Sequence, residues 1–274
     1  MPDITVTFLG TGAGNSIHRA HTAIVVDCAD GTRLLLDASS GNSVMRQGAA
    51  VGMLASQFDQ VLLTHQHGDH MGGIPFISGQ RRRDDAESTP LNVFSTEEAL
   101  DRLGRVCLAT QLNVPSVGQE GAYFADGRPY LRWTAVENEQ WITLGPTTRA
   151  STFPADHRPG AVGWKIESNG VSVVFSGDTR FSPSVTEAAQ GARLLIHEAF
   201  CTDREQQMAD SRGHSTAGEA ARVAAQAGVA ELVITHIDSP FSADTQPLID
   251  DAKLHYQGPI TAANDLTQIT VATP

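Results

Sequence analysis

The sequence has little cysteine, and its cysteines lack the spacing that holds metals. Its 274 residues include three cysteines, Cys28, Cys107 and Cys201, and no CxxC pair. An odd number of widely spaced cysteines argues against a disulfide framework and against a cysteine-ligated zinc site. We therefore expect all three to be small buried apolar residues.

Long apolar runs are also missing. No stretch approaches the roughly 20 apolar residues that a membrane-spanning helix needs. The chain passes from Met1-Pro2-Asp3 directly into a strand pattern, without the basic and apolar regions of a signal peptide. We expect a soluble, cytoplasmic protein.

Positive charge is scarce. The chain has 19 Lys and Arg against 31 Asp and Glu, which gives a net charge of -12. This balance counts against nucleic acid or an anionic membrane as a partner, because phosphate contacts need clustered basic residues. It leaves a polynucleotide substrate open, since bound divalent cations would add local positive charge.

The chain has enough apolar residues to form a buried core, because 41% of its residues are hydrophobic and 18% are charged. Helices are expected at 96–108, behind the N-cap Thr96, at 215–227, which Gly228 ends, and at 243–255. β-Branched and aliphatic runs predict strands at 4–9, 22–27, 32–37, 61–64, 162–167, 171–176, 194–197, 232–236 and in the closing stretch 260–271. This order, without a short repeat or a linker, predicts two β-rich layers covered by helices.

The segment from about 80 to 150 differs from the rest. Its charged run Arg81-Arg82-Arg83-Asp84-Asp85 is expected to be a solvated loop, and residues 110–145 show weak periodicity. We interpret 80–150 as a substrate-side insertion in a single domain that covers residues 1–274.

Four metal-binding side chains lie within six positions, directly after a hydrophobic strand. They are His65, His67, Asp69 and His70. A tight loop, which Gly68 allows to bend, can bring them together, and a divalent transition metal prefers imidazole nitrogen and carboxylate oxygen. Without a metal, this buried cluster would leave several polar groups in conflict.

The run His65-Gln66-His67-Gly68-Asp69-His70 matches the HxHxDH motif of the metallo-β-lactamase superfamily, and later segments resemble that family's motifs in order. The resemblance implies an α/β fold, the four-layer αββα metallo-β-lactamase sandwich, with metals at one edge of two packed sheets. It also implies one metal on His65, His67 and His157, a second on Asp69, His70 and His236, and Asp178 as a bridge.

A narrower resemblance is to the tRNase Z group. It rests on Phe8-Leu9-Gly10-Thr11-Gly12-Ala13-Gly14, on Leu195-Ile196-His197-Glu198-Ala199 and on Gly213-His214-Ser215-Thr216-Ala217. The resemblance implies that His214 is catalytic and works near Glu198. Purely structural roles stay open, because His214 could shape its turn and Glu198 could neutralise a buried neighbour.

One departure concerns the long arm with which the tRNA-processing enzymes grip tRNA. At the corresponding position, only Ser168-Asn169-Gly170 joins two expected strands, and Asn169-Gly170 is a strong signal for a tight hairpin. The absence of an arm makes the chain look more like the arylsulfatases and small phosphodiesterases that share this core.

The chemistry that we expect is hydrolysis by two divalent metal ions, Zn being favoured and Mn or Fe suitable. Such ions lower the pKa of a shared water from about 16 toward 7. His214, oriented by Glu198, would give a proton to the leaving group, and Asp69 would hydrogen-bond the nucleophile. A homodimer is expected from the resemblance alone.

Four functions are compatible with these sequence features. The preferred one is hydrolysis of a small-molecule phosphodiester or aryl sulfate ester, with RNA as a less favoured partner. The alternatives are a ribonuclease Z-type endonuclease on tRNA 3′ ends, a β-lactamase or lactonase, and a non-hydrolytic di-iron redox protein. The last is the least favoured, because His67 stands where redox members prefer a carboxylate and no flavodoxin-like extension exists.

Overall fold

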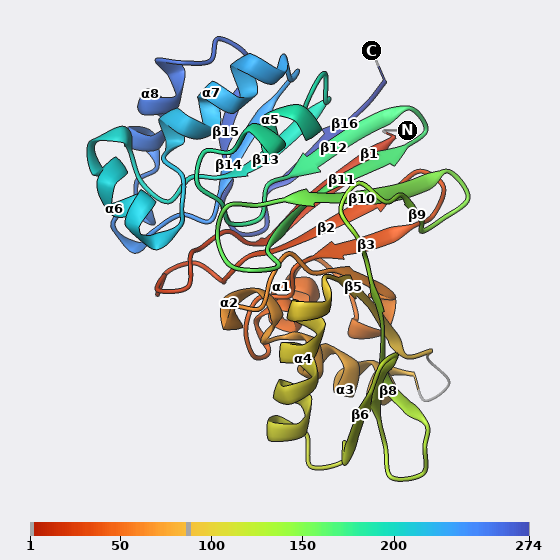
Figure 1. The fold of residues 1–274 in the computed structure, drawn as a ribbon. Helices are drawn as coiled ribbons and strands as arrows, with labels where there is room; N and C mark the ends of the chain where they lie inside the picture. Colours follow the sequence, from red (N-terminus) through yellow and green to blue (C-terminus); the bar gives the residue numbers. More distant parts are fainter. Residues whose placement is uncertain (1–2, 86–88, 274) are drawn as a thin grey trace.

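Two β-sheets packed face to face form the centre of the molecule, in a computed structural model that describes residues 3–85 and 89–273 (Figure 1). The first sheet contains, in spatial order, β16 (Gln268–Val271), β1 (Ile4–Gly10), β2 (Ala23–Cys28), β3 (Arg33–Leu36), β4 (Gln60–Leu62), β5 (Leu91–Ser95), β8 (Pro129–Ala135), β7 (Gly121–Tyr123) and β6 (Ser116–Gly118). The second contains β15 (Ile260–Ala262), β14 (Leu232–Thr235), β13 (Leu194–Glu198), β12 (Val171–Phe175), β11 (Val162–Ser168), β10 (Thr148–Pro154) and β9 (Ile142–Thr143).

Helices cover the outer face of each sheet. On the first sheet they are α1 (Ser43–Ala50), α2 (Gly68–Met71), α3 (Ile74–Asp84) and α4 (Glu97–Thr110). On the second sheet they are α5 (Pro183–Ala188), α7 (Ala217–Ala227) and α8 (Gln246–Lys253), and α6 (Gln206–Arg212) lies beyond the end of that sheet. Short 3-10 turns lie at Ala55–Gln57, Asp203–Glu205 and Ser239–Phe241. The expected four-layer αββα sandwich is confirmed.

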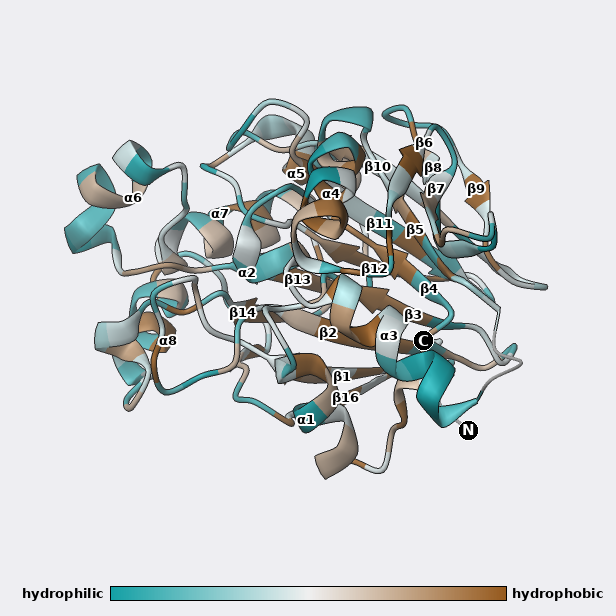
Figure 2. Ribbon diagram, turned by 90° about the horizontal axis from the view of Figure 1, so that it is seen from below, coloured by the Kyte–Doolittle hydropathy of each residue, from teal (hydrophilic) through white to brown (hydrophobic). Residues whose placement is uncertain are grey.

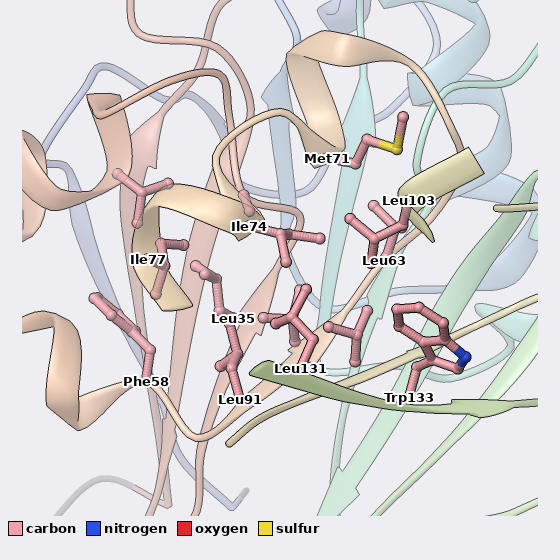
Figure 3. Close-up of a cluster of buried hydrophobic side chains, with 14 of the residues drawn as sticks. Leu35, Phe58, Leu63, Met71, Ile74, Ile77, Leu91, Leu103, Leu131 and Trp133 are labelled. Carbon is pink, nitrogen blue, oxygen red and sulfur yellow. The ribbon is translucent and has the colours of Figure 1, made fainter. Parts of the chain in front are cut away.

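The layers follow from the alternation of side chains along the strands. In β3, Leu34 and Leu36 point between the two sheets, whereas Leu35 points to the helices on the first sheet. Figure 3 shows the helix-facing cluster, where Leu35 and Leu63 meet side chains of α3 and α4 such as Ile74 and Leu103. Figure 2 shows the hydrophobic residues concentrated in the strands.

The hairpin between β11 and β12 is as tight as the sequence predicts. Asn169 and Gly170 have φ values of 51° and 78° and alone join the two strands. Positive φ at both positions gives the type I′ turn that matches the twist of a hairpin. No extension is inserted at this point of the chain.

Helix α7 begins and ends where its sequence indicates. The Thr216 side chain accepts a hydrogen bond from the Glu219 amide, and the Glu219 carboxylate accepts one from the Thr216 amide. This capping box satisfies two free amides of the first turn. Gly228, at φ 62°, ends the helix in the left-handed conformation that glycine tolerates best.

The charged run at 81–85 is not a solvated loop, contrary to our expectation. Arg81, Arg82 and Arg83 form the last turn of α3, and the Arg81 side chain is 2% exposed. Its guanidinium donates to the carbonyls of Ser56, Phe58 and Thr89 and to the Asp59 carboxylate. A buried arginine is tolerated here because these acceptors surround it.

Two other elements differ from the sequence prediction. The closing stretch 260–271 is two strands, and β15 and β16 lie in different sheets. The segment 110–145 holds four strands, β6 to β9, of which β8 has 7 residues and β6 is fully exposed. The other three strands have 2 or 3 residues each, which show too few alternations to be recognised. That 80–150 acts as a substrate-side insertion stays a prediction, and residues 86–88 lie outside the described residues.

All three cysteines are buried and unpaired. Among the helices of the described residues, none combines the length and the apolar content that crossing a bilayer requires.

Candidate active site

The site lies where the carboxyl ends of several strands from both sheets open into loops. His65 and His67 follow β4, and His157 follows β10. Asp178 and His236 follow β12 and β14. Because these strand ends meet at one edge of the sandwich, residues far apart in sequence converge there.

The structure brings all seven predicted metal ligands together. Ligand atoms of His65, His67, His157 and Asp178 lie within 4.8 Å of one another. The same holds for a second group, which consists of Asp69, His70 and His236. These groups match the two sets of ligands and the bridging carboxylate that the resemblance implies. The role of each residue as a ligand stays a prediction.

Asp178 is at the centre of the cluster. Its Oδ2 atom is buried among five imidazole nitrogens, and most of these distances are too long for hydrogen bonds. The distances from Oδ2 are 3.2 Å to His70 Nε2, 3.4 Å to His236 Nε2, 3.6 Å to His65 Nε2, 3.8 Å to His157 Nε2 and 4.0 Å to His214 Nδ1. Such spacing suits a carboxylate that shares cations with the imidazoles around it.

Four of the imidazoles are oriented by a hydrogen-bond partner on the side away from the centre. The partners of the outer nitrogen Nδ1 are Thr64 Oγ1 at 2.9 Å for His65, Asp37 Oδ2 at 2.7 Å for His70, the Gly213 carbonyl at 2.7 Å for His157 and Thr22 Oγ1 at 2.9 Å for His236. Each ring therefore presents Nε2 to the centre, which is how proteins orient metal-binding histidines.

The electrostatics of the cluster also favour a bound cation. Burial lowers the pKa of His157 to about 4 and that of His236 to about 3, so both are neutral and offer a lone pair. Burial acts the same way on His70, but the carboxylates of Asp178, Asp69 and Asp37 outweigh it and raise its pKa well above the ordinary value. Its buried Nε2 has no hydrogen-bond partner among the described residues. The donor set thus fits divalent metal ions, which would replace that proton.

Asp37 is a residue of the site that sequence reasoning missed. It is fully buried, and besides the His70 ring it accepts hydrogen bonds from the amide and the hydroxyl of Thr64 at 2.8 Å each. Its φ of 54° is unusual for a residue other than glycine and is held by these contacts. An aspartate at the end of an expected strand was the only available signal, and it is not specific.

His214 and Glu198 form a pair beside the cluster. His214 Nδ1 donates to Glu198 Oε1 at 3.1 Å, and the Phe200 ring stacks on the imidazole at 4.5 Å and 7°. Burial raises the pKa of Glu198 to about 7. Burial lowers the pKa of His214, but the charge and hydrogen bond of Glu198 outweigh it and raise it to about 9. At neutral pH the pair therefore holds a proton on the imidazole, next to the metal-binding residues.

Comparison with known proteins gives a consistent result. The model of the β-lactamase superfamily domain matches residues 32–237. A ribonuclease Z from Methanosarcina acetivorans is 28% identical, with 98% of each chain covered. A ribonuclease Z from Methanothermobacter thermautotrophicus is 32% identical, with 97% of this chain and 96% of the relative covered. The crystal structure of the short form of human tRNase Z superposes with a TM-score of 0.75 at 24% identity, over 98% of this chain and 100% of that one, which shows the shared fold.

Proposed function

From the premise that the chain belongs to the β-lactamase superfamily and is a metal-dependent hydrolase of that family, we propose that it hydrolyses phosphodiester bonds in RNA. The activity is that of a ribonuclease Z-type endonuclease, and its substrate is the 3′ end of precursor tRNA. The observation that carries the proposal is the similarity to ribonucleases Z, which extends over nearly the full length of both chains.

The expectation of a small-molecule ester, with RNA less favoured, is wrong. The same relatives overturn it, because they are named ribonuclease Z and the match covers 96–98% of their length. The expectation rested on the net charge of -12 and on the short β11–β12 connection. Net charge averages over the whole surface and omits bound cations, so it cannot decide the substrate of one site.

The predicted ligands would hold two metal ions, whose identity the donor set leaves as Zn, Mn or Fe. When bound, the ions supply a nucleophile at neutral pH and stabilise negative charge on the phosphate. One set of ligands is His65, His67 and His157, and the other is Asp69, His70 and His236. Asp178 lies between the two sets.

The chain's own proton chemistry rests on the pair of His214 and Glu198. The protonated imidazole, oriented by Glu198 and by the Phe200 ring, donates a proton to the leaving oxygen. Asp69, only partly buried at the edge of the cluster, accepts a hydrogen bond from the attacking water. Its pKa lies well below the ordinary value, chiefly because the charge of His70 outweighs burial, so the carboxylate is ionised and can accept.

A substrate panel tests the proposal. Protein loaded with Zn or Mn is incubated with 3′-extended precursor tRNA, mature tRNA, bis(p-nitrophenyl) phosphate and p-nitrophenyl sulfate. We expect cleavage of the precursor at one position near the 3′ end, with mature tRNA left intact. An inert precursor together with rapid hydrolysis of the small esters would contradict it.

A further inference from the structure

An open groove of about 460 Å³ lies directly beside the metal-binding cluster. Gln66 and Met71 line one side of it, and between them in sequence stand the predicted ligands His67, Asp69 and His70. The other side is α4, and Figures 1 and 2 both show this helix next to α2. The lining residues from α4 are Arg102, Arg105, Val106 and Ala109. The groove therefore continues the site along the surface.

Helix α4 presents two arginines and two apolar side chains to the groove. Arg102, Arg105, Val106 and Ala109 follow the spacing i, i+3, i+4 and i+7, which places them on one face of a helix. Glu97 and Asp101, together with Leu100, line a different pocket next to β6. Asp101 therefore lies between that pocket and the groove, where it pairs with Arg105.

The arginines of the groove have side chains available for a ligand. Arg102 is exposed and, among the described residues, makes no hydrogen bond or ion pair. Arg105 pairs with Asp101 at 2.9 Å, but both side chains are more than half exposed, at 67% and 55%. An ion pair this exposed contributes little free energy and is readily exchanged for a phosphate.

A third arginine stands on the loop that follows β10. Arg158 directly follows the predicted ligand His157, and its exposed side chain has no hydrogen-bond or ion-pair partner in the described part of the chain. Gln66 donates to the carbonyl of the next residue, Pro159, at 3.3 Å, which holds this loop against the groove. Three exposed arginines thus lie in the groove and on the loop beside it, in a chain whose net charge is -12.

We propose that this groove is the subsite that binds the sugar–phosphate backbone of the RNA substrate, with Arg102 and Arg105 of α4 and Arg158 of the neighbouring loop as its phosphate contacts. The inference rests on the proposed function. A guanidinium binds a phosphate with two parallel hydrogen bonds, so exposed arginines are suited to backbone contacts. Such contacts position the RNA without reading its sequence.

The test measures RNA binding and cleavage with the metal-loaded protein as a function of salt. The variants are Arg102→Ala, Arg105→Ala and Arg158→Ala, singly and combined. The control is Arg149→Ala, which removes an arginine of β10 that is also more than half exposed and pairs with Glu167. Mature tRNA is the binding probe, because the proposed reaction does not consume it, and precursor tRNA is the cleavage substrate.

Each groove variant is expected to weaken tRNA binding several-fold and to lower the slope of log K against log salt by about 0.7–0.9. The control is expected to leave the affinity and the slope unchanged. A variant that only damaged the fold would weaken binding without lowering the slope by the amount expected for one phosphate contact.

The outcomes separate the two proposals. Groove variants that bind and cleave RNA like the wild type would overturn the groove and leave the RNase function standing. Binding that depends on the arginines, without any cleavage, would support the groove and overturn the function. A wild-type protein that neither binds nor cleaves RNA would overturn both.

Discussion

At the scale of single residues, the site depends on side chains that orient its histidines through hydrogen bonds or ring stacking. The histidines around Asp178 are fixed by acceptors outside the cluster, and His214 is fixed by Glu198 and Phe200. Removal of such a partner should leave the predicted metal ligands in place but loosen their orientation. Asp37 is such a partner, because it bonds to His70 on the side away from the centre of the cluster.

Asp37→Ala removes the acceptor for His70 Nδ1, which lies 2.7 Å away. We expect the affinity for Zn to fall roughly 10- to 100-fold, as is typical when the partner of a metal-binding histidine is lost. The measurement is competition with a chromophoric chelator. Unchanged affinity would mean that the backbone of the loop orients His70 without Asp37.

His214→Ala removes the proposed proton donor without removing a predicted ligand. We expect turnover of precursor tRNA to fall about 10²- to 10⁴-fold, the usual contribution of a general acid, while the metal content per chain stays the same. Turnover and metal analysis on the same preparation give both values. Loss of metal would show that His214 is a ligand, a role for which its distance of 4.0 Å from Asp178 leaves room.

Glu198→Gln tests the pH dependence. The pKa of His214 is raised to about 9 by Glu198 against the effect of burial, so the proton donor is present below that pH and is lost above it. Without the carboxylate charge the pKa falls, and the alkaline limb of the kcat profile moves to lower pH by about 1 unit or more. An alkaline limb that stays at the same pH would show that the titration of His214 does not cause it.

At the scale of elements, the chain shows which features a sequence can disclose. The HxHxDH run, the Asn169-Gly170 hairpin and the capped helix α7 each have a local signal, and each lies where it was expected. The positions of His157 and His236 came from the order of motifs in the resemblance. Local signals say nothing about Asp37 or Arg81, because their roles depend on carbonyls and rings contributed by distant segments.

Arg81 gives a stability prediction at this scale. Arg81→Met leaves the carbonyls of Ser56, Phe58 and Thr89 without their donor, and each buried unpaired acceptor is costly. We expect a loss of about 2–4 kcal/mol in the free energy of unfolding, measured with urea. Arg83→Met is the matched control, since Arg83 is exposed in the same turn and should change stability by less than about 0.5 kcal/mol.

At the scale of the whole molecule, the alternation of apolar residues accounts for the layers, and strand polarity accounts for the position of the site. The net charge pointed away from RNA because it hides how arginines are distributed around the site. Oligomeric state is also a property of the whole surface, and the homodimer stays a prediction.

Metal removal is expected to affect both stability and activity. Asp37, Asp69 and Asp178 gather around His70, and bound cations would offset their mutual repulsion. A chelator should therefore lower the Tm by several degrees and abolish RNA cleavage, and added Zn or Mn should restore both, since a ligand of the native state stabilises it. An unchanged Tm with full activity would exclude the cluster as the metal site.

The most direct test of the central claim is the rate at which metal-loaded protein cleaves 3′-extended precursor tRNA, compared between the wild type and His65→Ala. His65 is buried in the cluster, and its ligand atom lies within 4.8 Å of those of His67, His157 and Asp178. We predict a single cut near the 3′ end by the wild type and a rate at least about 10²-fold lower in the variant, with the fold intact. Equal rates, or no cleavage by the wild type, would contradict the account.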